Sequence, residues 1–358
     1  MALFGLFSKE KKEKTPKGFY NVTIAEVKSL TDECVMISFD IPKSDSSDFK
    51  FKPGQFIEIM VNIDGKDERR DYSICSGKNE TLAIAVKSVS DGNVSKWINT
   101  KVKAGQDFLI SKPHGNFVVD DNSKNIVAIA AGSGITPIMS IAKEIESRGG
   151  NLRLFYGSRT VKSIIFKEEL DALSNTFVQY FISGEQIDGF ENGRIDKNSF
   201  TDCIKNDLSI LKADEFLICG PEQMIFDAVT ALKFFGVPEK KIHFELFSPS
   251  DLFAPKESEA GNSFQGIAKI AVILDGEKSN FELEGDGKTI LDACNKEGID
   301  APYNCRGGVC SSCRAKIISG SVMMSKNYTL TDEEVAEGYI LTCQAHPTSK
   351  ELTISFDE

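Results

Sequence analysis

Four cysteines near the C-terminal end constrain this chain more than any other feature of its sequence. Three of them lie in one short run, "CRGGVCSSC", which spans residues 305–313, and the fourth stands in "LTCQAH". The spacing is Cys305-x4-Cys310-x2-Cys313, and 29 residues separate Cys313 from Cys343. Cysteines can form disulfides, hold a zinc ion or carry an iron–sulfur cluster, and each role requires a different spacing.

The spacing of these four cysteines favours an iron–sulfur cluster. Disulfide frameworks belong to small secreted domains, and structural zinc sites usually offer two close pairs of ligands. Here three cysteines share one loop and the fourth is distant, which is the plant-type 2Fe–2S pattern. The residues between them are small, so the backbone can wrap a cluster and direct N–H groups at its sulfurs: Gly307, Gly308, Ser311 and Ser312. Four unrelated buried cysteines remain the alternative.

The composition indicates a cytoplasmic protein of two or three domains. Of the 358 residues, 41% are hydrophobic and 27% are charged, as in ordinary globular proteins. No apolar run approaches the roughly 20 residues of a membrane span, and the start lacks the pattern of a secretory signal. We therefore expect no stable membrane insertion.

The charge balance argues against nucleic acid as a partner. The net charge is −11, whereas phosphate binding needs clustered Lys and Arg. Residues 262–358 hold 9 Lys and Arg against 15 Asp and Glu. An acidic surface of this kind is usually just solvated, but it would also suit docking to a basic patch on a protein partner.

The pattern of apolar residues divides the chain into three folded segments. Short β-rich runs separated by turns predict an antiparallel β-barrel, and the alternation of strands and helices that follows predicts an α/β unit around a parallel sheet. After a Pro- and Ser-rich stretch, a hairpin, a short helix and a final strand predict an α+β domain. The expected boundaries are a flexible tail at 1–17, the barrel at 18–120, the α/β domain at 121–247, a linker at 248–262 and the α+β domain at 263–358.

The cysteine loop and its position in the chain resemble a known family. "CRGGVCSSC" is similar to the ligand loop of plant-type ferredoxins, and it follows a reductase-like body. Residues 18–358 therefore resemble the ferredoxin–NADP reductase family fused to a C-terminal ferredoxin. The resemblance implies an FAD-binding barrel, an NAD(P)-binding α/β domain and a ferredoxin domain of the β-grasp fold.

Two motifs in the barrel segment resemble the family's flavin site. In "RRDYSICS", residues 69–76, the resemblance implies that Arg70 pairs with the flavin phosphate, Tyr72 stacks on the ring and Ser73 bonds near N5. Taken alone, Tyr72 could be a core aromatic residue and Arg70 a surface charge. These residue types suit the chemistry, because arginine binds phosphate and a flat aromatic side chain covers a flat ring.

The second motif, "VKSVSDGNVSKWI", begins a predicted helix whose free N–H groups would favour phosphate. A simple capped helix is the alternative, and together the two motifs favour FAD over FMN. By the resemblance, the further residues expected to contact FAD are Val86, Lys87, Gly92, Asn93, Val94, Ser95, Thr136 and Phe247.

Two further motifs resemble the family's nicotinamide nucleotide site. "AGSGITPIMS" follows a strand and opens a helix, and it matches the family's G-x-G-x-S/T-P turn rather than the usual dinucleotide fingerprint. "CGPEQM" matches a C-G-P motif at a later strand end, where ligands of open α/β sheets bind. The resulting nucleotide contacts are Gly132, Gly134, Thr136, Pro137, Cys219, Gly220 and Pro221. The expected catalytic group is Tyr72, Ser73, Thr136 and Cys219, with Cys219 positioning the nicotinamide.

Ser158 and Arg159 follow another predicted strand end. In related reductases such a pair grips a 2′-phosphate, which favours NADPH over NADH, and an ordinary exposed arginine is the alternative. In "FELF", the resemblance implies Glu245 as a proton-relay residue and Phe247 as a ring-stacking residue, and the end of a core strand is the alternative.

These sites predict one electron path. NAD(P)H delivers electron pairs, a 2Fe–2S cluster accepts single electrons, and a flavin can mediate between them. The resemblance implies an oxygenase or hydroxylase component as the acceptor, with a di-iron component of the phenylacetyl-CoA epoxidase type favoured. Reductases of other oxygenase systems, or a redox sensor that retains the fold, are the alternatives.

Overall fold

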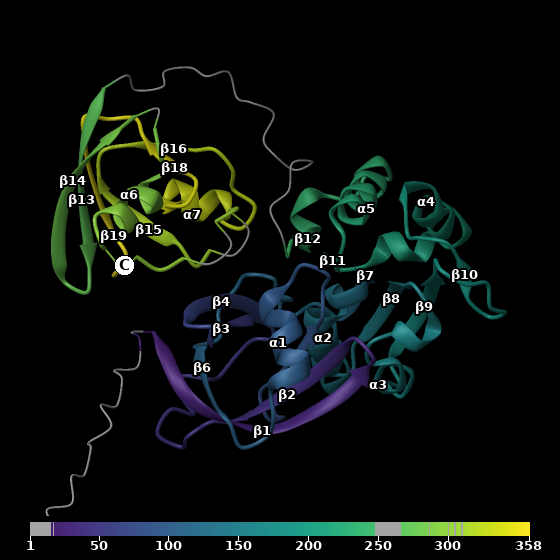
Figure 1. The fold of residues 1–358 in the computed structure, drawn as a ribbon. Helices are drawn as coiled ribbons and strands as arrows, with labels where there is room; N and C mark the ends of the chain where they lie inside the picture. Colours follow the sequence, from purple (N-terminus) through teal and green to yellow (C-terminus); the bar gives the residue numbers. More distant parts are fainter. Residues whose placement is uncertain are drawn as a thin grey trace, which may run out of the picture.

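The computed structural model describes most of the chain, and Figure 1 shows its three units. The described residues are Pro16 and residues 18–247, 266–285, 287–299, 301–303, 306–308 and 311–358. The predicted tail apart from Pro16, the predicted linker at 248–262, and Cys305 and Cys310 lie outside this set. Within it, no helix combines the length and the apolar character that crossing a membrane requires.

The first unit is an antiparallel six-stranded sheet in the order β4-β3-β6-β1-β2-β5. A bridge between Ile74 and Ile84 brings the two edges together, so the sheet closes into the expected barrel. Alternate apolar side chains fill the barrel, including Val22 and Ile24 of the first strand. Its elements are β1 (Phe19–Thr31), β2 (Cys34–Asp40), β3 (Phe56–Ile63), β4 (Lys66–Ser73), β5 (Ala83–Lys87), α1 (Asn93–Lys101) and β6 (Asp107–Ser111).

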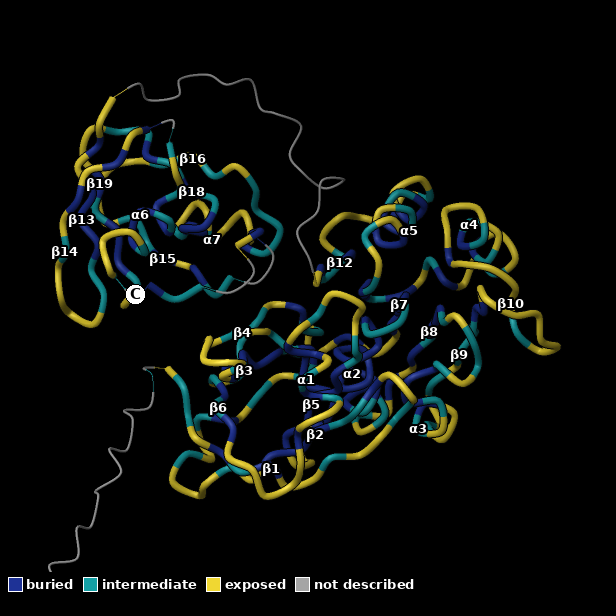
Figure 2. The backbone as a smooth tube through the Cα atoms, in the orientation of Figure 1, coloured by how far each residue is buried: buried dark blue, intermediate teal, exposed yellow. Residues whose placement is uncertain are grey.

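The second unit is a parallel sheet in the order β10-β9-β8-β7-β11-β12. It is covered on both faces, because Ala128 and Ala130 of β7 belong to one hydrophobic cluster and Val127 and Ile129 to another. Figure 2 shows the buried course of β7 and α2 in dark blue. Its strands are β7 (Asn125–Ala131), β8 (Asn151–Ser158), β9 (Thr176–Ile182), β10 (Glu191–Asn192), β11 (Glu215–Cys219) and β12 (Ile242–Glu245).

The helices of this unit lie between its strands. They are η1 (Gly132–Gly134), α2 (Ile135–Ser147), η2 (Val161–Ser163), α3 (Lys167–Asp171), α4 (Lys197–Asn206), η3 (Leu208–Lys212), α5 (Glu222–Phe234) and η4 (Glu239–Lys241). The sequence pattern did not predict α4. Phe200 and Ile204 are the only buried residues of this helix, so its apolar stripe is too short to be recognised in the sequence. A capping box formed by Asp196 and Ser199 starts the helix.

The third unit has a five-stranded mixed sheet in the order β14-β13-β19-β15-β17 and a small β16-β18 ribbon. The outer hairpin is antiparallel, whereas β13 and β19 are parallel, and α6 packs its apolar side into the same core. This is the α+β arrangement expected for residues 263–358. Its elements are β13 (Ile267–Leu274), β14 (Glu277–Glu284), α6 (Ile290–Lys296), β15 (Arg314–Ser319), β16 (Val322–Met324), α7 (Asp332–Ala336), β17 (Tyr339–Leu341), β18 (Ala345–Pro347) and β19 (Glu351–Ser355).

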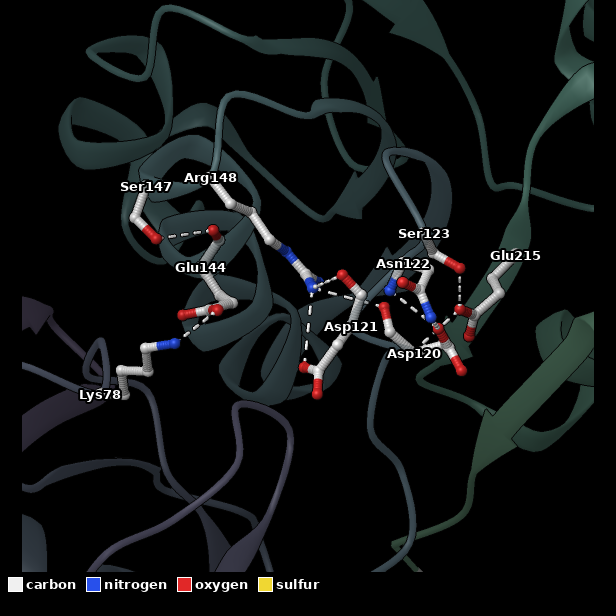
Figure 3. Close-up of polar contacts among 9 residues, drawn as sticks. All are labelled: Lys78, Asp120, Asp121, Asn122, Ser123, Glu144, Ser147, Arg148 and Glu215. Atoms are coloured by element: carbon white, nitrogen blue, oxygen red, sulfur yellow. Dashed lines mark hydrogen bonds and ion pairs between the residues drawn. The ribbon is translucent and has the colours of Figure 1, made fainter.

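A buried carboxylate fixes the segment that joins the first unit to the second (Figure 3). Glu215 of β11 accepts hydrogen bonds from the backbone N–H of Asp120, at 3.0 Å, and from the hydroxyl of Ser123. Its other oxygen lies 3.3 Å from Nε2 of His243. Burial alone would raise the pKa of Glu215, but these hydrogen bonds outweigh it and hold the pKa below its ordinary value.

The C-terminal end of helix α2 contacts the same connecting segment (Figure 3). Arg148 donates to the backbone carbonyl oxygens of Asp120 and Asp121, at 3.3 and 3.0 Å. One turn earlier, Glu144 pairs with Lys78 of the barrel unit at 2.8 Å. The barrel and the parallel sheet are therefore joined by both backbone and side-chain contacts.

We expect the Glu215→Gln substitution to destabilise the protein by about 1–3 kcal/mol near pH 7, because a buried hydrogen-bonded carboxylate is lost. The folded-state pKa of Glu215 is depressed, so its contribution is present above the unfolded value of about 4.3 and disappears as the pH falls through the folded value. Urea unfolding of the parallel-sheet unit, measured from pH 7 to pH 3.5, should therefore be less pH-dependent in the variant. Exposed Asp188 offers a matched control in Asp188→Asn, and equal losses in the two variants would contradict the assignment.

Candidate functional site

The order of the parallel strands creates a crevice at the centre of the second sheet. From β7 the chain first adds β8 and β9 on one side, and later adds β11 and β12 on the other. In such sheets the carboxyl ends of the two central strands leave a gap that binds ligands. Two of the predicted motifs follow those ends, namely the turn at 132–134 after β7 and residues 219–221 after β11.

These two motifs are packed directly against each other. A Cβ atom on Gly134 would lie 2.1 Å from the carbonyl oxygen of Cys219, so only glycine allows this approach. Gly132 has φ +55°, and Gly220 has φ +157°, where a Cβ atom would lie only 2.7 Å from Cε of Met224. The glycines thus serve backbone approach and turn geometry, as the dinucleotide-binding turn requires.

A cavity of about 890 Å³ opens beside this turn and is lined by the first two units together. Seven predicted site residues line it: Lys87, Gly132, Ser158, Arg159, Gly220, Pro221 and Phe247. Others lie behind its wall, since Thr136 and Cys219 are buried, at 3% and 0% exposure. Pro137 is also buried, within the first turn of α2.

The cavity also contains residues that sequence reasoning missed. The barrel contributes Glu33, Ser88, Val89, Ser90 and Lys96, and the parallel-sheet unit contributes Ser133, Gly157, Ser183, Gly193, Arg194, Ile195, Asp196, Gln223, Met224, Asp227 and Ala131. Half of them lie inside motifs quoted above but were not singled out there: Ser88, Val89, Ser90, Lys96, Ala131, Ser133, Gln223 and Met224. The others come from separate segments that carry none of these motifs. Only the three-dimensional arrangement brings them together.

Tyr72 and Ser73 lie at the end of β4, next to the end of β12. The Ser73 hydroxyl donates to Oε2 of Glu245 at 3.4 Å, across the boundary between the two units. Burial raises the pKa of Glu245 to about 8, and the bond from Ser73 opposes that rise only partly. Burial also raises the pKa of Tyr72, while Arg70 lowers it. Glu245 is paired in register with Cys219 of β11. Three predicted residues, Ser73, Cys219 and Glu245, therefore lie next to one another.

Arg70 is two residues from Tyr72 on strand β4 and is exposed to solvent. Its side chain is 50% exposed, lies 3.3 Å from Glu68 and donates to the backbone oxygen of Arg69 at 2.6 Å. The ion pair is on the surface, where such pairs contribute little. The guanidinium group is therefore accessible to an anionic ligand.

The start of α1 has the features of a phosphate-binding turn. Among the described residues, no side chain caps this helix at Gly92. A Cβ atom on Gly92 would lie 2.4 Å from Oγ of Ser95 and 2.5 Å from Cγ2 of Val89, so any larger residue would force these two side chains to shift. Ser95 is itself fixed, since its hydroxyl donates to the Gly92 carbonyl at 3.2 Å. The N–H groups of the first turn thus fit an anionic group.

The described part of the cysteine loop is tightly wound. Arg306 and Ser311 have φ +54° and +53°, and Gly308 has φ +78°. Cys313 and Cys343 are both buried, at 2% and 4% exposure, in the core of the third unit. Such backbone conformations let the chain wrap closely around a bound group.

Two observations test whether this loop fits a cluster. The Thr342 N–H and hydroxyl both donate to the Cys313 carbonyl, at 3.1 and 2.9 Å, and link the two cysteine segments. The Ser312 hydroxyl is buried without a hydrogen-bond partner among the residues that the structure describes. A buried orphan donor beside a cysteine fits an adjacent group rich in acceptors, as cluster sulfurs are.

The third unit contacts the other two beside this loop. The Tyr328 N–H donates to the Gly308 carbonyl at 3.1 Å, and its side chain packs against the hydrophobic cluster of the parallel-sheet unit. Asn116 of the first unit lies 3.5 Å from a carboxylate oxygen of Glu334. The cysteine loop is therefore close to the body of the molecule.

Three family models match the chain in order. The oxidoreductase FAD-binding domain matches residues 21–119, the oxidoreductase NAD-binding domain matches 128–230, and the 2Fe-2S iron-sulfur cluster binding domain matches 272–348. The chain thus contains binding domains for all three predicted cofactors.

Among curated proteins, the chain is similar to one of the subunits of 1,2-phenylacetyl-CoA epoxidase from Escherichia coli, with 34% identity over 95% of this chain and 98% of the relative. It is also similar to the ferredoxin reductase component of 3-ketosteroid-9-alpha-monooxygenase from Mycobacterium tuberculosis, at 32% identity over 94% of this chain and 95% of the relative. These relatives are aligned over nearly their whole length.

Solved structures support the same fold. A type IV self-sufficient cytochrome P450 monooxygenase matches 94% of this chain and 41% of its own, with a TM-score of 0.72 and 22% identity. Phthalate dioxygenase reductase matches 95% of this chain and 98% of its own, with a TM-score of 0.58 and 22% identity. The chain belongs to the ferredoxin–NADP reductase family, as an NAD(P)H-dependent flavin and iron–sulfur oxidoreductase with its 2Fe–2S domain at the C-terminal end.

Proposed function

We propose that this chain is the reductase component of an oxygenase system and transfers electrons from NAD(P)H, through FAD and the 2Fe–2S cluster, to a partner protein. The observation that carries the proposal is the shared cavity. Lys87 of the barrel and Gly132 and Gly220 of the parallel-sheet unit line one space. A nucleotide on one unit would thus lie beside a flavin on the other. Bound FAD would supply the conversion between electron pairs and single electrons.

The barrel residues hold and orient the flavin in this proposal. Arg70 and the first turn of α1, from Gly92 through Ser95, bind its phosphates, since both offer free N–H donors. Tyr72 covers the ring. Ser73 and Glu245 keep a hydrogen bond at its edge, and the burial of Glu245 favours the protonated acid at neutral pH. Val86, Lys87, Thr136 and Phe247 complete this flavin site.

The parallel-sheet residues bind the nicotinamide nucleotide. The turn that contains Gly132, Gly134, Thr136 and Pro137 receives the pyrophosphate at the start of α2. On the opposite strand end the C-G-P motif, Cys219, Gly220 and Pro221, sets the position of the nicotinamide. Buried Cys219, whose pKa burial raises far above its ordinary value, remains a neutral thiol and is not a nucleophile.

Four cysteines hold the cluster in this proposal: Cys305, Cys310, Cys313 and Cys343. The domain limits in this proposal are 18–120 for the FAD-binding barrel, 121–247 for the NAD(P)-binding domain and 263–358 for the ferredoxin domain. A cytoplasmic location fits this assignment, because the described cysteines outside the ligand set, such as Cys34 and Cys75, are thiols rather than disulfides.

The favoured acceptor is a di-iron oxygenase component of the phenylacetyl-CoA epoxidase type, supported by the 34% identity to the Escherichia coli relative. The second candidate is a steroid monooxygenase or another oxygenase, supported by the 32% identity to the mycobacterial component. Purified candidate oxygenases distinguish the two, because only the correct partner restores NAD(P)H-dependent product formation at low reductase concentration.

An anaerobic titration with NADPH, and then with NADH, tests the proposed electron path. Three electrons fill one FAD and one cluster, so flavin and cluster absorbance should bleach fully after about 1.5 equivalents. Cluster bands that are present but never bleach would contradict the path and favour a redox sensor.

We expect Cys343→Ala to abolish the cluster but to leave FAD binding intact, because the two sites lie in separate units. Iron and labile sulfide per chain should fall at least tenfold, while flavin content and NAD(P)H-driven flavin bleaching stay near wild type. Cys294→Ala is the matched control, since Cys294 is equally buried in the same core. Comparable iron loss in the control would indicate misfolding of the domain, and normal iron in Cys343→Ala would exclude Cys343 as a ligand.

A further inference from the structure

An acidic residue of the flavin unit reaches the end of β8 and pairs with Arg159. Nη2 of Arg159 lies 3.2 Å from Oε2 of Glu33, which is on the β1–β2 turn. Both side chains line the shared cavity, together with Ser158. The pair thus brings opposite charges from two units to one wall of the predicted nucleotide site.

The position of Glu33 is fixed by its backbone. Its carbonyl oxygen accepts a hydrogen bond from the N–H of Ser88 at 2.7 Å, and its own N–H donates to Oγ1 of Thr31 at 3.3 Å. Ser88 lines the cavity as well. The turn therefore presents the Glu33 carboxylate to the cavity from a rigid β-structure.

The ion pair itself is weak and open to solvent. The side chains of Arg159 and Glu33 are 70% and 51% exposed, and such pairs contribute little to folding stability. A doubly charged ligand can therefore compete for the arginine. Removing the carboxylate should leave the fold unchanged.

The end of the second strand is where dinucleotide-binding sheets distinguish the ribose 2′ position. An acidic residue there binds the 2′-hydroxyl group of NAD, and an arginine there accommodates the 2′-phosphate of NADP. In chain order β7 is the first strand of this sheet and β8 is the second, and Ser158 is the last residue of β8. This chain has both kinds of residue at that point, one from each unit.

We infer that Glu33 is a specificity-determining residue that weakens the binding of NADP(H). It pairs with Arg159 and adds a negative charge where a 2′-phosphate would be placed, so the Ser158–Arg159 pair does not by itself make the enzyme strictly NADPH-dependent. The inference rests on the proposed function, because it deepens the assignment of the nucleotide site. The further charged residues of the cavity are three basic and two acidic ones, Lys87, Lys96, Arg194, Asp196 and Asp227. Glu33 is the carboxylate that pairs with Arg159.

Binding of 2′,5′-ADP and 5′-AMP to the oxidised holoenzyme tests the inference, because these probes differ only in the 2′-phosphate. With calorimetry at about 20 mM ionic strength, Glu33→Gln should bind 2′,5′-ADP about three- to tenfold more tightly than wild type, and 5′-AMP within about twofold. The gain should shrink in about 0.5 M salt, as a charge effect does. Arg159→Gln should weaken the binding of 2′,5′-ADP but not that of 5′-AMP.

Glu26→Gln is the matched control, because Glu26 is an exposed glutamate of β1, the strand that leads into the turn with Glu33, and does not line the cavity. A similar gain in this control, an unchanged affinity of Glu33→Gln for 2′,5′-ADP, or an unaltered affinity of Arg159→Gln would each overturn the inference. Normal 5′-AMP binding in that case would leave the proposed function standing. If the wild-type protein bound neither probe, both the inference about Glu33 and the proposed function would fail.

Discussion

The contact between Gly134 and the carbonyl oxygen of Cys219 is the constraint on which the rest of the site depends. Because no Cβ atom fits there, the turn after β7 and the end of β11 can approach until their backbones touch. The crevice of the parallel sheet then has a fixed width. The register of β11 with β12 places Glu245 beside Cys219, and Glu245 in turn meets Ser73 of the barrel. One backbone contact thus aligns elements of two units.

Contacts of Glu215 and Arg148 with the connecting segment at residues 120–123 stabilise this alignment. A buried carboxylate holds the connecting segment at Asp120 and Ser123, and Arg148 holds the same segment from the end of α2. The nucleotide unit is therefore fixed relative to the barrel by contacts far from the cavity. This arrangement suits hydride transfer, which needs two reacting groups in van der Waals contact and tolerates little misalignment.

Much of this structure could be predicted from local sequence. The four-cysteine spacing, the barrel strands and the strand–turn–helix at 125–147 are encoded in short runs, so the three units and their cofactors followed from pattern and resemblance. Helix α4 was missed because only Phe200 and Ile204 mark its buried face. The pairing of Glu33 with Arg159 could not be predicted, because the two residues are 126 positions apart and no motif links them. Contacts between units depend on packing, which local patterns do not contain.

Electrons from NAD(P)H should reach the cluster only through the flavin. Protein from which FAD has been stripped, with its iron content verified, tests this most directly in an anaerobic rapid-mixing experiment. We expect NADPH and NADH to leave the cluster absorbance unchanged, dithionite to bleach it, and added FAD to restore bleaching by the nucleotide. Bleaching of the cluster by NADPH at the same rate without FAD would contradict this electron path.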